Sequence, residues 1–310
     1  MSGTIRVGVV GVGYLGKFHA EKYSKMNDVK LVGVVDVVKE RADQIACQFN
    51  TRSFHSHLDL LKEIDAVSIV VPTEFHFMVS RDFIVKGIHT MIEKPITKNV
   101  DEAEELTSLA KKSGAIIQVG HLERFNPAVV ALCDYLEHPL FIETHRLSSF
   151  KDRGTDVDVI LDMMIHDIEI ILCLVKSPVL SIDAVGVPVV TKKVDIANAR
   201  LKFENGCVAN ITASRISDKE MRKIRVFQSD SYLSADCLKN EVTGYRRIEE
   251  REGAPPTILP INFETHKVDP LEDELRCFID SVWTHAEPRV SGEDGTAALK
   301  IACEITKRMQ

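Results

Sequence analysis

Three glycines and an aspartate near the amino terminus have the spacing of a nucleotide-binding turn. The segment Gly11–Gly16 reads GVGYLG and follows an apolar run. Its glycines would allow a tight turn, close approach of the backbone to a pyrophosphate, and packing of a helix on a strand. Asp36 lies 20 residues beyond Gly16 and ends the next apolar run. A carboxylate at this place accepts hydrogen bonds from ribose hydroxyls, so the pattern predicts a dinucleotide site.

The charge of Asp36 also bears on which dinucleotide would bind. A carboxylate beside the ribose repels a 2′-phosphate, and this favours NAD over NADP. Arg41 lies nearby in the sequence and could instead pair with such a phosphate, or it could lie on a solvated helix face. We therefore expect NAD as the cofactor, with NADP the less favoured alternative.

Two short segments follow later strands and should lie at the same sheet edge. In a parallel sheet, ligands bind beyond the carboxyl ends of the strands. Lys94, in the triplet Glu-Lys-Pro, could point at the reacting end of the cofactor or be a surface lysine; the bond to Pro95 could be cis. His76 could contact nicotinamide or ribose, or lie on a helix surface. The predicted cofactor-binding residues are Gly11, Gly13, Tyr14, Leu15, Gly16, Asp36, Arg41, Pro72, Thr73, His76, Glu93 and Lys94.

Asp162 and His166 are spaced i,i+4 in an apolar stretch, so on a helix they would share one face. Buried charged groups are costly unless they are paired or hydrogen-bonded. The pair therefore indicates either a lined cavity or a satisfied structural pair or helix cap. An imidazole with an ordinary pKa of about 6.5 would suit a general base at neutral pH.

The first 120 residues alternate between two sequence patterns, and the elements that these patterns predict would position these groups. Apolar runs suited to buried strands alternate with amphipathic, helical stretches, which predicts βαβ units and a parallel sheet. The expected strands are Ile5–Val10, Val29–Asp36, Ala66–Val71, Thr90–Ile92 and Ala115–Val119. The expected helical stretches are Lys39–Phe49, Glu74–Lys86 and Val100–Lys112.

The pattern of predicted helices and strands changes after about residue 123. Helices are expected at Asn126–Glu137 and Asp162–Val175, strands at Leu140–Phe150 and repeatedly from Val179 to Ile261, and closing helices near Pro270–Thr284 and Gly292–Lys307. The turn Glu204-Asn205-Gly206 between two strand patterns indicates a hairpin. We predict an α/β chain with a Rossmann, doubly wound parallel sheet over 1–123. Residues 124–310 would form an α+β domain with a large, mostly antiparallel sheet. The final helices of this domain could pack back on the first domain.

Composition excludes several other classes of protein. The 310 residues are 45% hydrophobic and 27% charged, typical of globular domains. No apolar run reaches the ~18 residues that span a bilayer, and a net charge of −7 argues against a nucleic-acid partner. The seven cysteines include no CxxC or Cys/His cluster, so no metal site is expected. Without a signal region we expect a cytoplasmic protein with reduced thiols.

These motifs together resemble the glucose–fructose oxidoreductase / inositol dehydrogenase (Gfo/Idh/MocA) family. The resemblance runs from GVGYLG through Asp36, the Glu-Lys-Pro triplet and the DxxxH pair to the segment Pro288–Gly295. The stretch GHLERFNP at Gly120–Pro127 resembles the branch that contains UDP-N-acetylglucosamine 3-dehydrogenases. The resemblance implies a Rossmann domain over 1–123 followed by a substrate-binding and oligomerisation domain over 124–310, whose large, open, mostly antiparallel sheet often builds dimers or tetramers. It also implies an NAD-dependent dehydrogenase that oxidises a secondary hydroxyl of a sugar, here a nucleotide sugar oxidised to a 3-keto sugar.

The resemblance further suggests roles for individual residues. His166 would be the general base and Lys94 would hold the reacting oxygen, with Lys94 as the rival base; Asp162 would accept a hydrogen bond from a substrate hydroxyl or orient the site. We expect the imidazole of His166 to face the nicotinamide. Candidate substrate-binding residues are Arg124, Asn126 and Arg153. The alternatives are a dehydrogenase of a free cyclitol or aldose, and a non-catalytic dinucleotide-sensing regulator.

Overall fold

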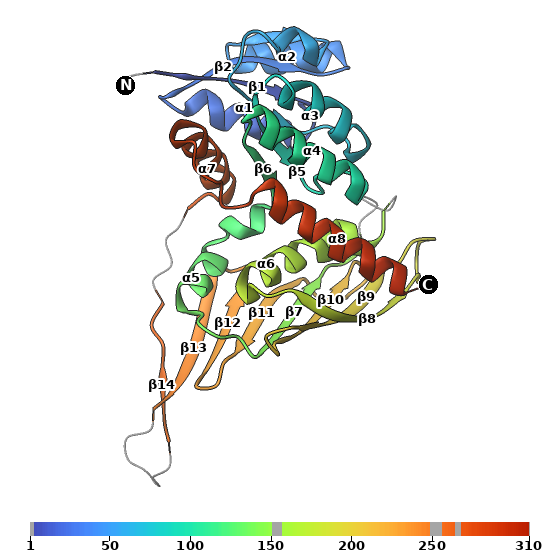
Figure 1. Cartoon of the computed structure of the whole chain (residues 1–310), viewed down its shortest axis with the longest axis vertical. Helices are drawn as coiled ribbons and strands as arrows, with labels where there is room; N and C mark the ends of the chain where they lie inside the picture. Colours follow the sequence, from blue (N-terminus) through green and yellow to red (C-terminus); the bar gives the residue numbers. More distant parts are fainter. Residues whose placement is uncertain (1–2, 151–156, 249–255, 264–267, 310) are drawn as a thin grey trace. The chain divides into compact units, whose positions relative to one another are not determined.

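The computed structural model describes residues 3–150, 157–248, 256–263 and 268–309. The chain divides into two compact units, which are described separately (Figure 1). Unit 1 comprises residues 1–122 and 269–299, and unit 2 comprises 123–268 and 300–310.

Unit 1 is built on a six-stranded parallel sheet in the order β3-β2-β1-β4-β5-β6. This is the strand order of a doubly wound dinucleotide-binding fold. In β1 five of six residues are buried, because helices cover both faces of the sheet. The strands are β1 Ile5–Val10, β2 Val29–Val35, β3 Arg52–Phe54, β4 Ala66–Ile69, β5 His89–Glu93 and β6 Ile117–Gly120.

Helices cover the two faces of this sheet with two separate hydrophobic clusters. On one face, Tyr23 of α1, Ile45 of α2 and Phe278 of α7 share a cluster with Val7 and Val9 of β1. On the other face, residues of η1 and α3 pack on Val10 and Val67 of the sheet. The helical elements are α1 Gly16–Lys25, α2 Lys39–Gln48, η1 His57–Leu60, η2 Thr73–Phe75, α3 His76–Ile84, α4 Val100–Ser113 and α7 Pro270–Thr284.

Unit 2 is built on an eight-stranded sheet in the order β14-β13-β12-β11-β7-β10-β9-β8. Only the β7–β10 pair of this sheet is parallel among the described strands, which confirms the mostly antiparallel sheet expected from the sequence. The strands are β7 Phe141–Leu147, β8 Val179–Val187, β9 Ile196–Phe203, β10 Val208–Ser214, β11 Met221–Phe227, β12 Ser231–Asp236, β13 Glu241–Ile248 and β14 Thr257–Pro260.

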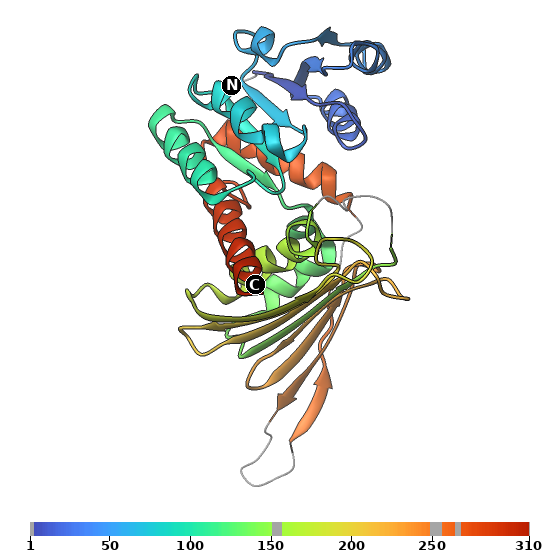
Figure 2. The same cartoon turned by 90° about the vertical axis from the view of Figure 1, so that its right-hand side faces the viewer.

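One face of this sheet is covered by helices and the other is not (Figure 2). In β9, buried residues alternate with exposed ones, as expected for a strand with one covered face. Asn198 donates to Thr212, and Arg200 to Asn210, on the uncovered side. The covering elements are α5 Pro127–Tyr135, the π-helical turn η4 Ile160–Met164, α6 Ile165–Val175 and the carboxyl end of α8, which spans Gly292–Arg308.

Local sequence signals explain where several helices begin. Asn126 caps α5 by accepting from the N–H of Ala128, and Pro127 occupies the first turn. The hairpin predicted at Glu204–Gly206 is present between β9 and β10, with Gly206 at φ +87°.

Two elements differ from the sequence-based expectation. The short edge strand β3 was not predicted, because its three residues form no apolar run. The helix predicted from Asp162 instead begins with the π-helical turn η4, which ordinary helical periodicity does not reveal. In the described part of the chain, no helix is long and apolar enough to span a membrane.

Candidate functional site

The glycine turn of unit 1 has the geometry that the sequence analysis predicted. Gly11 adopts φ +87°, and an added Cβ would lie 2.4 Å from the carbonyl oxygen of Val70. A Cβ on Gly16 would lie 1.8 Å from the carbonyl oxygen of Gly11, so only glycine lets α1 pack this close to β1. A Cβ on Gly13, by contrast, would meet no described atom within 4 Å. The middle glycine therefore leaves space for a ligand, as a pyrophosphate-binding turn requires.

The amino end of α1 is suited to an anion. Within the described residues, no side chain caps this helix and no acidic residue lies in its first turn. Backbone N–H groups at such an end carry partial positive charge and bind phosphate groups. Tyr14 is 73% exposed beside this turn, and its ring packs edge-on against Phe18. These residues fit the pyrophosphate of a dinucleotide.

Asp36 follows β2 and is fixed by the backbone on both sides of it. Its Oδ2 accepts from the N–H of Val12 at 3.0 Å, and its Oδ1 accepts from the N–H of Val38 at 2.9 Å. The guanidinium of Arg41 lies 3.2 Å from the same carboxylate. Asp36 and Arg41 are thus in contact, which the sequence could only suggest.

The triplet Glu93-Lys94-Pro95 ends β5 at the carboxyl edge of the sheet. The peptide bond between Lys94 and Pro95 is cis, and Lys94 is half-buried. The Glu93 carboxylate lies 3.2 Å from Nε2 of His19 on α1, and its other oxygen accepts from the N–H of Lys94 at 3.3 Å. His19 was not among the predicted site residues, although it lies one helical turn beyond Gly16.

His76 makes contacts of a different kind from those predicted. Its side chain is buried, with Nδ1 at 2.9 Å from the carbonyl oxygen of Pro95 and Nε2 at 2.8 Å from that of Val71. Burial lowers the pKa of His76, although the backbone carbonyls of Pro95 and Val71 oppose this shift. The neighbouring Pro72 and Thr73 begin the turn η2 at the same sheet edge. Contact of these three residues with the cofactor stays a prediction.

Asp162 and His166 lie on consecutive helical elements of unit 2. Asp162 belongs to the π-helical turn η4, and His166 is the second residue of α6. Both side chains are half-buried. A π-helical turn inside an α-helix is rare and occurs often at functional sites.

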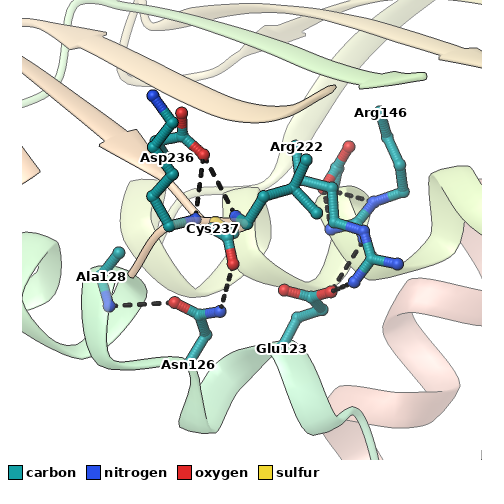
Figure 3. A network of polar contacts seen from close by, with 10 residues as sticks. Glu123, Asn126, Ala128, Arg146, Arg222, Asp236 and Cys237 are labelled. Carbon is teal, nitrogen blue, oxygen red and sulfur yellow. Dashed lines mark hydrogen bonds and ion pairs between the residues drawn. The ribbon is translucent and has the colours of Figure 1, made fainter. Parts of the chain in front are cut away.

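A buried ion-pair network lies beside His166 in the sequence and was not predicted. Arg146 on β7 donates from Nε and Nη2 to Oδ1 of Asp167 at 3.0 and 2.7 Å, and from Nη1 to Glu123 at 2.9 Å. Arg222 on β11 donates to the same oxygen of Glu123 at 2.8 Å (Figure 3). Burial would raise the pKa of Glu123, but the two guanidinium groups outweigh it and lower that pKa. Glu123 is therefore ionised at neutral pH.

The predicted substrate-binding residues occupy different environments. Arg124 is 9% exposed, and its Nε lies 3.6 Å from the carboxylate of Glu169. Asn126 caps α5 and donates to the carbonyl of Cys237 at 3.0 Å (Figure 3). Arg153 lies outside the described residues. Arg222, which was not predicted, is the half-exposed arginine of the network, with 48% of its side chain accessible.

A signal for the network was present in the alternation of β7. Ile142, Thr144 and Arg146 occupy the buried positions of this strand. A charged residue in phase with buried positions must have a partner, because an unpaired buried charge is costly. The nearby Glu-Arg pair of the GHLERFNP stretch supplied a candidate carboxylate, Glu123.

Comparison with known proteins agrees with both units. Residues 5–121 match the oxidoreductase family with an NAD-binding Rossmann fold, and residues 130–233 match the GFO/IDH/MocA C-terminal domain. UDP-N-acetylglucosamine 3-dehydrogenase of Acidithiobacillus ferrooxidans is 37% identical over 97% of this chain and 96% of its own. Its crystal structure superposes with a TM-score of 0.91, covering 98% of this chain and 97% of that one.

Several more distant relatives are named as dehydrogenases of cyclitols. Myo-inositol 2-dehydrogenase of Thermotoga maritima is 26% identical over 99% of this chain and 96% of its own. The scyllo-inositol dehydrogenase of Lactobacillus casei, solved with NAD(H) and scyllo-inositol, shares the fold with a TM-score of 0.79 at 20% identity, over 98% of this chain and 96% of that one. The chain therefore belongs to the GFO/IDH/MocA family of NAD-binding oxidoreductases.

Proposed function

We propose that this protein oxidises the 3-hydroxyl of UDP-N-acetylglucosamine, or of a closely similar nucleotide sugar, to a ketone with NAD. The observation that carries this proposal is the 37% identity to a UDP-N-acetylglucosamine 3-dehydrogenase over 97% of the chain. In this proposal the glycine turn, the Glu-Lys-Pro triplet and the DxxxH pair would supply the residues that the reaction needs. A dehydrogenase of a free cyclitol is the second candidate, because relatives at 26% identity carry that name.

Residues of both units take part in the proposed reaction. NAD, when bound at the glycine turn and Asp36, supplies the acceptor for the hydride that leaves the carbinol carbon. His166 takes the proton of the reacting hydroxyl as general base. Lys94 holds the same oxygen and stabilises the negative charge that develops on it. Asp162 accepts a hydrogen bond from a neighbouring hydroxyl of the sugar.

The proposed substrate also needs a cation for its diphosphate. Arg124 is buried against Glu169, so its charge is already neutralised. Arg222 keeps half of its side chain accessible while Glu123 anchors one nitrogen. A guanidinium anchored in this way can offer its remaining N–H groups to phosphate oxygens. We therefore add Arg222 to Arg153 as a proposed diphosphate ligand.

We also propose a homodimer or homotetramer located in the cytoplasm. All seven cysteines are free thiols in the structure, as in proteins of a reducing compartment. The face of the unit 2 sheet that no described helix covers offers a surface for a second copy.

The test is a screen of nucleotide sugars and free cyclitols with NAD, following the reduced cofactor and including a trap for the ketone. Reduction with UDP-N-acetylglucosamine, together with binding of UDP alone, supports the proposal. Reduction with a cyclitol and no affinity for UDP supports the second candidate. No reduction with any sugar despite NAD binding would contradict both.

A variant then tests the role of His166. His166→Asn should lower kcat by about 100-fold or more, because a positioned base contributes about 10²–10⁴ in rate. The dissociation constant of NAD should stay nearly unchanged. His145→Asn is the matched control, since His145 lies on β7 between the buried positions Thr144 and Arg146 and therefore on the opposite sheet face. Equal turnover in the two variants would remove His166 from the base role.

A further inference from the structure

Two buried histidines contact the turn that carries Lys94. His19 on α1 is 0% exposed and His76 at the start of α3 is 1% exposed. One contacts the side chain of Glu93, the residue before Lys94, and the other contacts the carbonyl of Pro95, the residue after it. The lysine is therefore bracketed by contacts on both sides.

His76 connects this turn to the glycine turn. Its ring lies between the carbonyl oxygens of Pro95, at 2.9 Å, and Val71, at 2.8 Å. Val71 follows Val70, whose carbonyl oxygen would lie 2.4 Å from a Cβ on Gly11. The segment Val70-Val71, which His76 contacts, thus packs directly against the glycine turn, the proposed pyrophosphate site. A neutral imidazole has one N–H, so the ring donates to one of these two carbonyls. In either tautomer the ring lies between the segment beside the glycine turn and the residue after Lys94.

The second contact leaves the Glu93 carboxylate little room to move. Nε2 of His19 lies 3.2 Å from Oε1, and the N–H of Lys94 lies 3.3 Å from Oε2. The carboxylate also packs on Gly120 of β6, where an added Cβ would lie 2.9 Å from the carboxylate carbon and from both oxygens. The Glu93 carboxylate is thus in contact with both α1 and β6.

We propose that His76 is a positioning residue which, with the His19–Glu93 pair, fixes Lys94 relative to the bound dinucleotide. The inference rests on the proposed function, in which Lys94 holds the reacting oxygen. Misplacing a group by about 1 Å can cost about 100-fold in rate, so a holding contact remote from the substrate can control turnover. His76 contacts the backbone carbonyl oxygens of Pro95 and Val71 and not the side chain of Lys94. Its role can therefore be tested with Lys94 left in place.

Three substitutions at His76 separate its two contacts. His76→Phe fills a similar volume and donates to neither carbonyl. The amide nitrogen of Asn can replace Nδ1 and donate to Pro95, whereas that of Gln can replace Nε2 and donate to Val71. We expect kcat to fall by about 10- to 100-fold in H76F and to be restored more by H76N than by H76Q. In each variant the factor by which kcat falls should exceed the change in the dissociation constant of NADH, because the ring directly contacts the residue after Lys94.

A second measurement does not depend on the identity of the sugar. The rate at which an amine-reactive ester acylates Lys94, followed by mass spectrometry of the peptide, reports the place of its amine. This rate should change in H76F and in Gly120→Ala, which displaces the Glu93 carboxylate. The matched control is His57→Phe, because His57 binds Asp82 of the same helix α3 at 2.8 Å.

The outcomes distinguish this inference from the proposed function. If H76F and H57F show the same Lys94 acylation rate as the unsubstituted protein, His76 does not position the lysine. If H76F changes that rate but no sugar reduces NAD with the unsubstituted protein, the positioning role stands and the proposed function fails. Should H76F not fold, the difference between H76N and H76Q decides, and equal kcat and acylation rates in these two would overturn the inference.

Discussion

Replacing Asp36 with Asn should weaken NADH binding by about 10- to 100-fold. A hydrogen bond to a charged group contributes about 1.5–3 kcal/mol, and each 1.4 kcal/mol changes a dissociation constant about tenfold. In the structure both carboxylate oxygens already accept from the backbone, one from Val12 and the other from Val38. Asn retains a single acceptor oxygen, so its amide nitrogen must face one of these N–H groups. The turn and the ribose contact are therefore weakened together.

The same substitution should shift the preference between cofactors. Arg41 lies 3.2 Å from Asp36, and this carboxylate both neutralises it and repels a 2′-phosphate. In D36N the guanidinium becomes available to a phosphate, so the affinity for NADPH relative to NADH should rise. Adding Arg41→Ala to D36N should reverse the gain for NADPH and leave NADH binding nearly as in D36N.

Fluorescence titration with NADH and NADPH measures both effects without any sugar. Asp65→Asn is a suitable control, because Asp65 binds Arg6 and precedes β4, at the sheet edge opposite the glycine turn. We expect D65N to leave both dissociation constants within about threefold of the original. An unchanged NADH constant in D36N would show that the ribose is bound elsewhere, and an unchanged ratio would refute the role of Arg41.

Two further predictions concern stability. Arg146→Met should lower the free energy of unfolding by about 3–5 kcal/mol, measured by urea denaturation, because the buried carboxylate of Asp167 loses its guanidinium partner, while Glu123 keeps Arg222. Arg225→Met, which breaks a partly exposed ion pair, should cost less than about 1 kcal/mol. Burial and the neighbouring imidazole of His285 lower the pKa of His89 in the folded protein. Its neutral ring therefore stabilises the fold above the unfolded-state pKa of about 6.5, and this contribution is lost as the pH falls through the lower folded-state pKa. His89→Asn keeps an acceptor for the N–H of Ile116 without titrating, and its unfolding free energy should fall less between about pH 7 and pH 5; equal slopes would contradict this assignment.

Most of the architecture was predictable because buried positions place apolar residues in the sequence with a spacing typical of helices or strands. The continuous apolar run Ile5–Val10 indicated a strand covered on both faces, and β1 is such a strand. The helix predicted at Pro270–Thr284 is present with those bounds, since Asp269 caps it and Pro270 starts it. Strand β3 escaped because three residues at a sheet edge are held by backbone pairing with β2, which has no sequence period.

The glycine turn could be predicted because its backbone geometry demands glycine, whereas contacts between distant segments could not. Gly11 and Gly16 are required by close approaches of main-chain atoms, so their spacing identified the turn. His76 binds two carbonyl oxygens that come from separate segments, Val71 and Pro95, and no local pattern records their meeting. The role of a buried polar residue depends on partners that only the folded chain brings to it.

The network in unit 2 bears on why charges are buried beside the proposed base. A hydrophobic cluster of the same volume would stabilise this region as well as an ion pair does. It would not fix the rotation of α6, whereas two N–H groups of Arg146 converge on one oxygen of Asp167, the residue after His166. We therefore expect this contact to fix the direction in which the side chain of His166 projects from α6. If R146M, assayed where it remains folded, kept the turnover of the original protein, the network would serve stability alone; we expect kcat to fall while NADH affinity is unchanged.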